Sequence, residues 1–420
     1  MGRIGSLGIL SAVLFAVTAC DHRPWCMPGT ERASNGNYVE GSLKLIRKDE
    51  WCQYVGEDGQ PVKHGTLVRW HPNGQPHEKV RYRKGTPHGR RQSWYANGQK
   101  EEEGSWNEGI REGTWSRWWE NGTRRLKLEF AKGRPNGLEV SWHEDGKKAQ
   151  EGHWSDGLRQ GVWQRWHKNG QLASSVEYKD DTQTGIETTW FENGNKELEG
   201  EWRNGAREGI WTRYFQSGAK QSETPNRSGK PQGTELFYFE NGQKELSIDW
   251  QDGVQNGRWT RWHTNGVKHW EGAVDHNQQQ GVWTRWYANG TKAEEGNWLD
   301  DQQHGVGSQW YENGQKKIEM GYEHGKPHGI DLAWYENGQL KHQGSWKDGA
   351  EEGVWINWHE NGSKWRERHY ASGRQHGIEL AWDETGHEWL RSEWRDGREF
   401  GPDGQPITRP PEDRGSFSLR

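Results

Sequence analysis

Methionine, phenylalanine and cysteine are scarce in this 420-residue chain, with only 3, 8 and 3 copies. Hydrophobic residues make up 29% of the sequence, although it holds 31 tryptophans and 58 glycines. A conventional core is built mainly from leucine, isoleucine, valine and phenylalanine, so a large compact core is not expected. Apolar burial must come mostly from aromatic rings on short strands.

An excess of one charge sign is also missing. Charged residues make up 28% of the chain, and the formal net charge is -5. A general nucleic-acid binder should instead be basic. We therefore expect no nucleic-acid partner.

The first 20 residues differ from the rest of the chain. Arg3 supplies a short positive region, and Ile4 to Ala16 is an apolar run interrupted only by glycine and serine. This pattern predicts a secretory signal over residues 1–19, too short for a stable transmembrane span. We expect an exported protein.

Val17-Thr18-Ala19-Cys20 resembles the lipobox of bacterial lipoproteins. The resemblance implies that Cys20 becomes the lipid-modified first residue of the mature protein, on the periplasmic side of the cell envelope. Asp21 resembles an inner-membrane retention signal, which favours the inner over the outer membrane. The alternative is an ordinary cleaved signal whose Cys20 is incidental.

Two cysteines remain, Cys26 and Cys52. An even pair in an exported protein is typical of a disulfide, which would staple the segment before the repeats. The alternative is two free thiols.

The dominant feature is a 24-residue repeat marked by glycines. One set recurs at every 24th residue from Gly74 to Gly386, and Asn precedes Gly at eleven of these fourteen positions. Asn-Gly between aromatic runs is a strong hairpin signal, because a type I′ turn needs positive φ at both central residues. We expect a tight hairpin turn at each Asn-Gly.

A second glycine set recurs with the same period from Gly65 to Gly401. It predicts a wider turn, such as Asn107–Glu112, and therefore two strands per unit and 28 strands between Gly65 and Gly401. Consecutive strands joined by short loops are antiparallel neighbours. The predicted fold is all-β: an elongated single-layer antiparallel β-meander of tandem hairpin repeats, twisted or rolled.

The predicted domain organisation has five parts. It places a signal peptide at 1–19, a linker at 20–36, an irregular N-terminal cap at 37–64, fourteen repeats at 65–401 and a disordered tail at 402–420.

The turns also predict which residues lie opposite each other. Around Asn121-Gly122, Trp119 is expected opposite Arg124, and Gly113 opposite Phe130. Around the wider turn, Trp106 is expected opposite Gly113, and Gly104 opposite Trp115. Each ring then covers a glycine, a common way to stabilise glycine in a strand.

The pair formed by Gly104 and Trp115 alternates between repeats. In the next repeat Leu128 pairs with Glu139, so a side chain at the first position accompanies loss of tryptophan at the second. This predicts limited room across the strand pair and a partial 48-residue superperiod. We expect binding specificity to lie in this alternation.

The opposite face carries a tryptophan column, with one aromatic residue per repeat. Its candidate binding surface consists of Trp94, Trp118, Trp142, Trp166, Trp190, Trp262, Trp286, Trp310, Trp334 and Trp358. Lysines such as Lys100 are expected to face the residue after each column aromatic. Two interpretations remain open: cation–π packing within the sheet, or a stacking platform for a ligand such as a sugar ring.

Two segments resemble a known repeat: Trp310-Tyr311-Glu312-Asn313-Gly314-Gln315-Lys316-Lys317 and Gly344-Ser345-Trp346-Lys347-Asp348-Gly349. They resemble the MORN-repeat variant, which defines bacterial proteins often labelled YwqK-family antitoxins. The resemblance covers about four-fifths of the chain and implies a single-layer antiparallel β-meander used for binding. The chain departs from the family by using tryptophan where tyrosine or phenylalanine is more usual.

Catalytic and metal motifs are not evident in the sequence. There is no His-Glu-x-x-His, no Cys-x-x-Cys, no serine nucleophile elbow and no phosphate loop. The 19 histidines mostly follow the repeat, for example His328 before a wider-turn glycine and His359 after a column tryptophan. We therefore expect no catalytic residue, metal site or cofactor.

These observations favour a non-enzymatic, membrane-anchored repeat scaffold that binds another protein at the cell envelope. One alternative is a glycan- or peptidoglycan-binding lipoprotein that uses exposed tryptophan rows. Another, implied by the family resemblance, is an antitoxin-like neutraliser of a partner protein.

Overall fold

The computed structural model describes residues 31–35, 49–401 and 403–407. The described strands form one antiparallel sheet that does not close on itself, which confirms the predicted all-β fold class. The predicted signal peptide, Cys20, Asp21 and Cys26 lie outside the described residues. Within this described part, no helix is long and apolar enough to cross a membrane.

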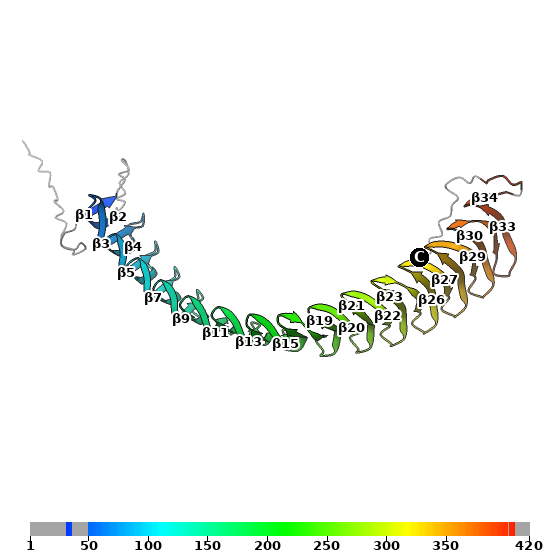
Figure 1. Cartoon of the computed structure of the whole chain (residues 1–420), viewed down its shortest axis with the longest axis horizontal. Coiled ribbons are helices and arrows are strands. Elements are labelled where there is room, and N and C mark those ends of the chain that lie inside the picture. The colour runs from blue at the N-terminus through cyan, green and yellow to red at the C-terminus, as the bar shows by residue number, and fades with distance from the viewer. Residues whose placement is uncertain (1–30, 36–48, 402, 408–420) are drawn as a thin grey trace, which may run out of the picture. The chain divides into compact units, whose positions relative to one another are not determined.

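The chain comprises two compact units. Unit 1 extends to Gln171 and includes Tyr178–Asp181, and unit 2 comprises Leu172–Glu177 and the chain from Thr182 onward. Figure 1 shows that strands adjacent along the chain lie side by side within each unit. The strands that lie within unit 1 are β1 (Glu31–Asn35), β2 (Asp49–Val55), β3 (Pro61–Trp70), β4 (Pro76–Arg83), β5 (Thr86–Trp94), β6 (Lys100–Asn107), β7 (Ile110–Trp118), β8 (Arg124–Ala131), β9 (Arg134–Trp142), β10 (Lys148–Ser155) and β11 (Leu158–Trp166).

Strand β12 (Leu172–Lys179) includes residues of both units. The strands of unit 2 are β13 (Thr182–Trp190), β14 (Lys196–Arg203), β15 (Ala206–Tyr214), β16 (Lys220–Arg227), β17 (Lys230–Pro231), β18 (Gly233–Tyr238), β19 (Lys244–Gln251), β20 (Val254–Trp262), β21 (Lys268–Asp275), β22 (Gln278–Trp286), β23 (Lys292–Leu299), β24 (Gln302–Gln303), β25 (Gly305–Trp310), β26 (Lys316–Glu323), β27 (Lys326–Trp334), β28 (Leu340–Lys347), β29 (Ala350–Trp358), β30 (Lys364–Ala371), β31 (Arg374–Gln375), β32 (Gly377–Trp382), β33 (Glu388–Arg395) and β34 (Arg398–Phe400).

The number of repeat strands agrees with the sequence. Strands β3 to β33 make 28 when β17/β18, β24/β25 and β31/β32, each split by a short interruption, are counted once. The predicted irregular cap at 37–64 is wrong for its described part, because β2 pairs with β3 and extends the sheet. The predicted linker at 20–36 likewise contains β1, which pairs with β2. Of the predicted tail, only 403–407 are described, and Pro406 bridges to Phe400.

The Asn-Gly turn is not the predicted type I′ turn. At Asn121-Gly122, Trp119 N donates to Thr123 O at 2.8 Å and Gly122 N donates to Trp119 O at 2.9 Å, so the loop has three residues. Only Gly122 has positive φ, at 87°. The Asn121 side chain accepts a hydrogen bond from Thr123 N and donates one to Glu144 O of the next repeat, both at 2.9 Å. Asn121 therefore stabilises the loop through its side-chain amide group, and its backbone does not adopt the left-handed conformation.

The turn expected to be wide is the tight one. Asn107 pairs with Ile110, and the two residues between them, Glu108 and Gly109, have φ of 50° and 83°. This is the two-residue geometry of a type I′ hairpin. The additional residues expected in the turn lie instead in a bulge beyond it.

Two of the predicted pairings are wrong and one is confirmed. Gly113 pairs with Phe130 as predicted. Trp106, however, lies opposite Arg111, because the register shifts between Glu103 and Ser105. On the other side of the hairpin Arg124 pairs with Trp118, not with the predicted Trp119. A bulge of this kind inserts residues into one strand of an antiparallel pair.

There is little room between Trp115, or its equivalents in other repeats, and the glycine that each ring covers, as the sequence indicated. A Cβ added at Gly104 would collide with the Trp115 ring. The same collision occurs at Gly152, Gly200, Gly272 and Gly344 with Trp163, Trp211, Trp283 and Trp355. These rings, together with small side chains such as Ala333, pack on one face of the sheet, called here the packed face. Trp115 is 3% exposed and Trp211 is 2% exposed.

Candidate binding surface

The tryptophan column lies on the opposite face, called here the outer face. Strand alternation places Ile330, Leu332 and Trp334 of β27 together on this face. All ten members of the candidate surface are half-buried, so the column is neither fully exposed to solvent nor part of a buried core. One aromatic row is therefore largely buried and the other is partly exposed.

Lysines cover the column rings. Lys100 Nζ lies 4.9 Å from the centroid of Trp118, in the next repeat, and also pairs with Glu103 at 2.5 Å. It is paired across the hairpin with Trp94 itself, not with the following residue as predicted. The same lysine contact recurs at Trp166, Trp262, Trp286, Trp310, Trp334 and Trp382. Cation–π packing within the sheet thus occupies part of these ring surfaces.

The 48-residue alternation lies on the packed face. Trp154 Nε1 donates to the Glu139 carboxylate at 2.7 Å, and its ring meets Trp163 edge-on with centroids 5.0 Å apart. The same indole-to-carboxylate bond joins Trp202 to Glu187, Trp250 to Glu235 and Trp346 to Asp331. The alternation thus provides a carboxylate acceptor for the indole N–H groups of these four tryptophans. The expectation that this alternation carries specificity stays a prediction.

An exposed aliphatic row on the outer face was not predicted from the sequence. Its longest uninterrupted stretch, in unit 2, consists of Val282, Val306, Ile330, Val354 and Ile378, one per repeat, which are 41% to 58% exposed. Leu138, Val162, Ile186 and Ile210 occupy the same repeat position earlier in the chain. The signal was available: each follows a glycine of the second set, where most strands of a solvated face would place polar residues.

Two polar residues interrupt this row within unit 2. Thr234 and Arg258 occupy the aliphatic position in consecutive repeats, and both contact Asp249. Thr234 Oγ1 donates to Asp249 Oδ1 at 2.7 Å, and Arg258 N donates to Oδ2 at 3.0 Å. An open hollow of about 880 Å³ lies here and is bordered on one side by Val282. The outer face therefore offers a polar recess beside an apolar row.

Many histidines make hydrogen bonds that recur from repeat to repeat, as their positions indicated. His64, His88, His328 and His376 each accept, at Nδ1, a backbone N–H from 20 residues later, at 3.4 or 3.5 Å. Glu112, Asn136, Glu208 and Gln232 accept the equivalent bond in other repeats. After the column tryptophan, His143 Nε2 lies 2.9 Å from Trp166 O, where Tyr95 OH in another repeat donates to Trp118 O.

One of the two predicted disulfide cysteines is described. Cys52, in β2, is buried and disulfide-bonded. Its pairing with Cys26 stays a prediction, because Cys26 lies outside the described residues.

A family model described as the MORN repeat variant matches residues 63–84, 87–108, 159–180, 183–204, 279–300, 303–324, 327–348 and 351–371. Each match spans one hairpin with the turn chemistry described above. The chain is a MORN repeat variant protein with eight matched repeats. Between and beyond these matches, the MORN hairpins continue in phase: the loop-closing bond seen at Gly122 is made at all fourteen glycines from Gly74 to Gly386.

Other comparisons are less informative. No curated protein matches the chain. Among solved structures, a crystal structure of TcdB2-TccC3 matches at 10% identity and a TM-score of 0.15, covering 90% of this chain and 21% of that chain. A crystal structure of TcdB2-TccC3-Cdc42 matches at 10% identity and a TM-score of 0.13, covering 83% and 24%. The chain thus spans about a fifth to a quarter of these structures, and likeness at this level carries no argument.

Proposed function

We propose that this protein is a non-enzymatic scaffold that binds another protein through the outer face of its MORN sheet. The observation that carries the proposal is the aliphatic row of unit 2. Large aliphatic side chains recur there in five consecutive repeats and remain substantially exposed. Exposed apolar side chains that recur along one face favour an interaction site there.

The dimensions of the row suit a protein partner. Consecutive row residues are two strand spacings apart, with one strand between them, so they lie roughly 10 Å apart and the five span roughly 40 Å. A standard interface buries about 800 Å² on each partner. The half-buried column tryptophans on the same face add a residue type that is enriched at binding hot spots.

A glycan ligand is the weaker alternative. Sugar recognition by the column would need open ring faces, and lysine ammonium groups already lie over seven of these rings. The exposed aliphatic side chains provide no flat aromatic face on which a sugar ring could stack. The observations therefore support a protein partner over a glycan.

The proposed location is the periplasmic side of the cell envelope, through a lipid on Cys20. This part of the proposal is supported by the lipobox-like Val17–Cys20 sequence. Membership of the YwqK-family antitoxins is a separate proposal, which rests on the MORN resemblance. A toxic neighbouring gene neutralised on co-expression would support it, and an exported protein that neutralises nothing would contradict it.

The test replaces the row with threonine, the residue found at the same position in Thr66, Thr114 and Thr234. Five substitutions, Val282→Thr, Val306→Thr, Ile330→Thr, Val354→Thr and Ile378→Thr, should therefore leave the fold intact. Each removes at least one methyl group, worth about 0.8 kcal/mol when buried by a partner. The five together total about 4 kcal/mol, close to a thousandfold in Kd.

Binding is read by crosslinking in cells followed by purification of the envelope fraction. We expect the unaltered chain to recover a specific protein that the row variant loses. A control chain carries threonine at exposed turn positions such as Gln315 and Gln339, and should retain the partner. Equal recovery by both variants, or no specific partner for the unaltered chain, would contradict the proposal.

A further inference from the structure

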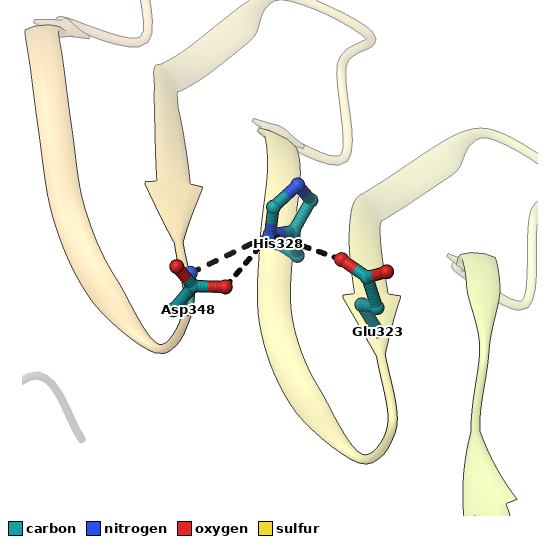
Figure 2. A group of neighbouring side chains, drawn as sticks. All are labelled: Glu323, His328 and Asp348. Carbon is teal, nitrogen blue, oxygen red and sulfur yellow. Dashed lines mark hydrogen bonds and ion pairs between the residues drawn. The ribbon is translucent and has the colours of Figure 1, made fainter.

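One cluster of side chains departs from the repeat pattern in unit 2. Glu323 is the last residue of β26, His328 lies in β27, and Asp348 lies in the turn after β28. Figure 2 shows the imidazole of His328 between the two carboxylates. His328 Nδ1 lies 3.5 Å from Glu323 Oε2 and 3.6 Å from Asp348 Oδ1, and one ligand atom from each residue lies within 4.8 Å of the others.

This combination occurs in a single repeat. In the other repeats with histidine at this position, the residue five before it is Gly59, Arg83, Leu299 or Ala371. A histidine bracketed by acids five residues before and twenty residues after is therefore found only at His328. The turn role of the histidine does not explain this, because His88 fills the same role beside Arg83.

The geometry of the cluster fits a small cation. Three acceptor atoms converge, and the Asp348 backbone N–H donates to one of them, His328 Nδ1, at 3.5 Å. With zinc-to-ligand distances near 2.0–2.2 Å, neighbouring ligands of a tetrahedral site lie roughly 3.3 Å apart. Two of the three ligand separations are within a few tenths of an ångström of this value.

We propose that Glu323, His328 and Asp348 form a zinc-binding site on the turn edge of the MORN sheet. One imidazole nitrogen and two carboxylate oxygens suit Zn²⁺, whereas Mg²⁺ and Ca²⁺ prefer oxygen ligands alone. The side chains are 41%, 50% and 76% exposed for His328, Glu323 and Asp348. Water therefore completes the coordination, and the ion ties two neighbouring hairpins together.

Zinc binding displaces one weak hydrogen bond. The Asp348 N–H that Nδ1 accepts lies in an exposed turn, so water can replace its acceptor when Nδ1 binds the ion. Metal ligation requires neutral imidazole and ionised carboxylates, so protons compete with zinc for this site.

The test is a calorimetric titration of the full chain with Zn²⁺ alone at neutral pH. The variants are Glu323→Gln, His328→Gln and Asp348→Asn. The last keeps a residue that tolerates the left-handed backbone of this turn, where φ is 53°. Each change should weaken the affinity for one equivalent of zinc by about tenfold or more. Mutation of groups that only orient metal ligands already lowers metal affinity by this factor.

Two controls make the outcome specific. His376→Gln removes a histidine that has Asp396 at 3.5 Å but Ala371 in place of the first acid, so zinc binding should not change. His304→Gln removes one member of an imidazole pair, with His324, whose centroids are 5.4 Å apart. If the three site variants bind zinc like the unaltered chain, or if only His304→Gln loses an equivalent, the proposal is wrong.

Discussion

Replacing Gly272 with alanine should destabilise its hairpin, whereas the same change one repeat later should not. Gly272 lies in β21 with ordinary backbone dihedrals, and a Cβ there would collide with the buried Trp283 ring. Gly296 occupies the equivalent position in β23, and the nearest atom to its added Cβ is 3.7 Å away. The two glycines therefore form a matched pair that differs in the ring above them.

The expected effects have opposite signs. Forcing extra volume into a packed site costs about 1–3 kcal/mol. Replacing a strand glycine with alanine where space allows gains about 0.5–1 kcal/mol, because glycine loses more chain entropy on folding. The two variants should therefore differ by roughly 1.5–4 kcal/mol in local stability.

Hydrogen exchange read by mass spectrometry is the suitable assay, because a repeat protein opens locally and need not unfold in one step. We expect peptides covering β21 and β22 to lose roughly tenfold or more of their protection in Gly272→Ala. Peptides covering β23 in Gly296→Ala should keep or gain protection. In a Trp283→Ala background, Gly272→Ala should cost little, since the ring is gone. Equal loss in both single variants would refute the reasoning.

Two further predictions concern local contacts. Asn193→Ala should cost about 1 kcal/mol, seen as faster exchange in its hairpin, because it removes an acceptor for Asn195 N and a donor to Gln216 O. Burial and a hydrogen bond to Glu223 raise the pKa of Tyr238 from 10 to about 12. The folded state thus holds this proton more tightly, so the contribution to stability is complete below pH 10 and is lost from about pH 10 to 12. Absorbance titration of the unaltered chain against Tyr238→Phe checks this, and a difference spectrum that titrates near pH 10 would contradict it.

Most of the fold could be predicted from the periodicity of the sequence. Glycines at a strict 24-residue interval determine where the chain reverses, and the strand count follows from them. The turn types did not follow, because Asn-Gly can serve either by left-handed backbone at both residues or by an Asn side chain that bonds across the loop. Asn121 does the latter, and the paired positive φ angles occur at Glu108 and Gly109.

Register could be predicted only in part. Gly113 lies opposite Phe130 as predicted because two deviations cancel: the three-residue loop shifts the pairing by one residue, and the bulge between Arg117 and Trp118 shifts it back. Trp106 opposite Arg111 required knowledge of a bulge, which no residue near Gly104 announces. The collision between Gly104 and Trp115 was nevertheless visible as covariation among repeats, since every repeat samples the same site with different residues.

The candidate surface was only partly predictable. The tryptophan column was identified, but its covering lysines come from the preceding repeat, a contact that depends on how successive hairpins stack. The aliphatic row was overlooked because isolated valines and isoleucines in strands are ordinary, and only exposure distinguishes them from core residues. The cluster around His328 was assigned to the repeat because its acids lie five and twenty residues away.

Site-specific photo-crosslinking tests most directly whether the outer face binds a protein. A benzophenone side chain placed at Ile330, in the middle of the aliphatic row, should give one discrete adduct in intact cells. The same group at the exposed turn residue Gln339 should give little or none of it. Adducts of equal yield at both positions, or none at Ile330 with an otherwise folded and exported chain, would contradict the account.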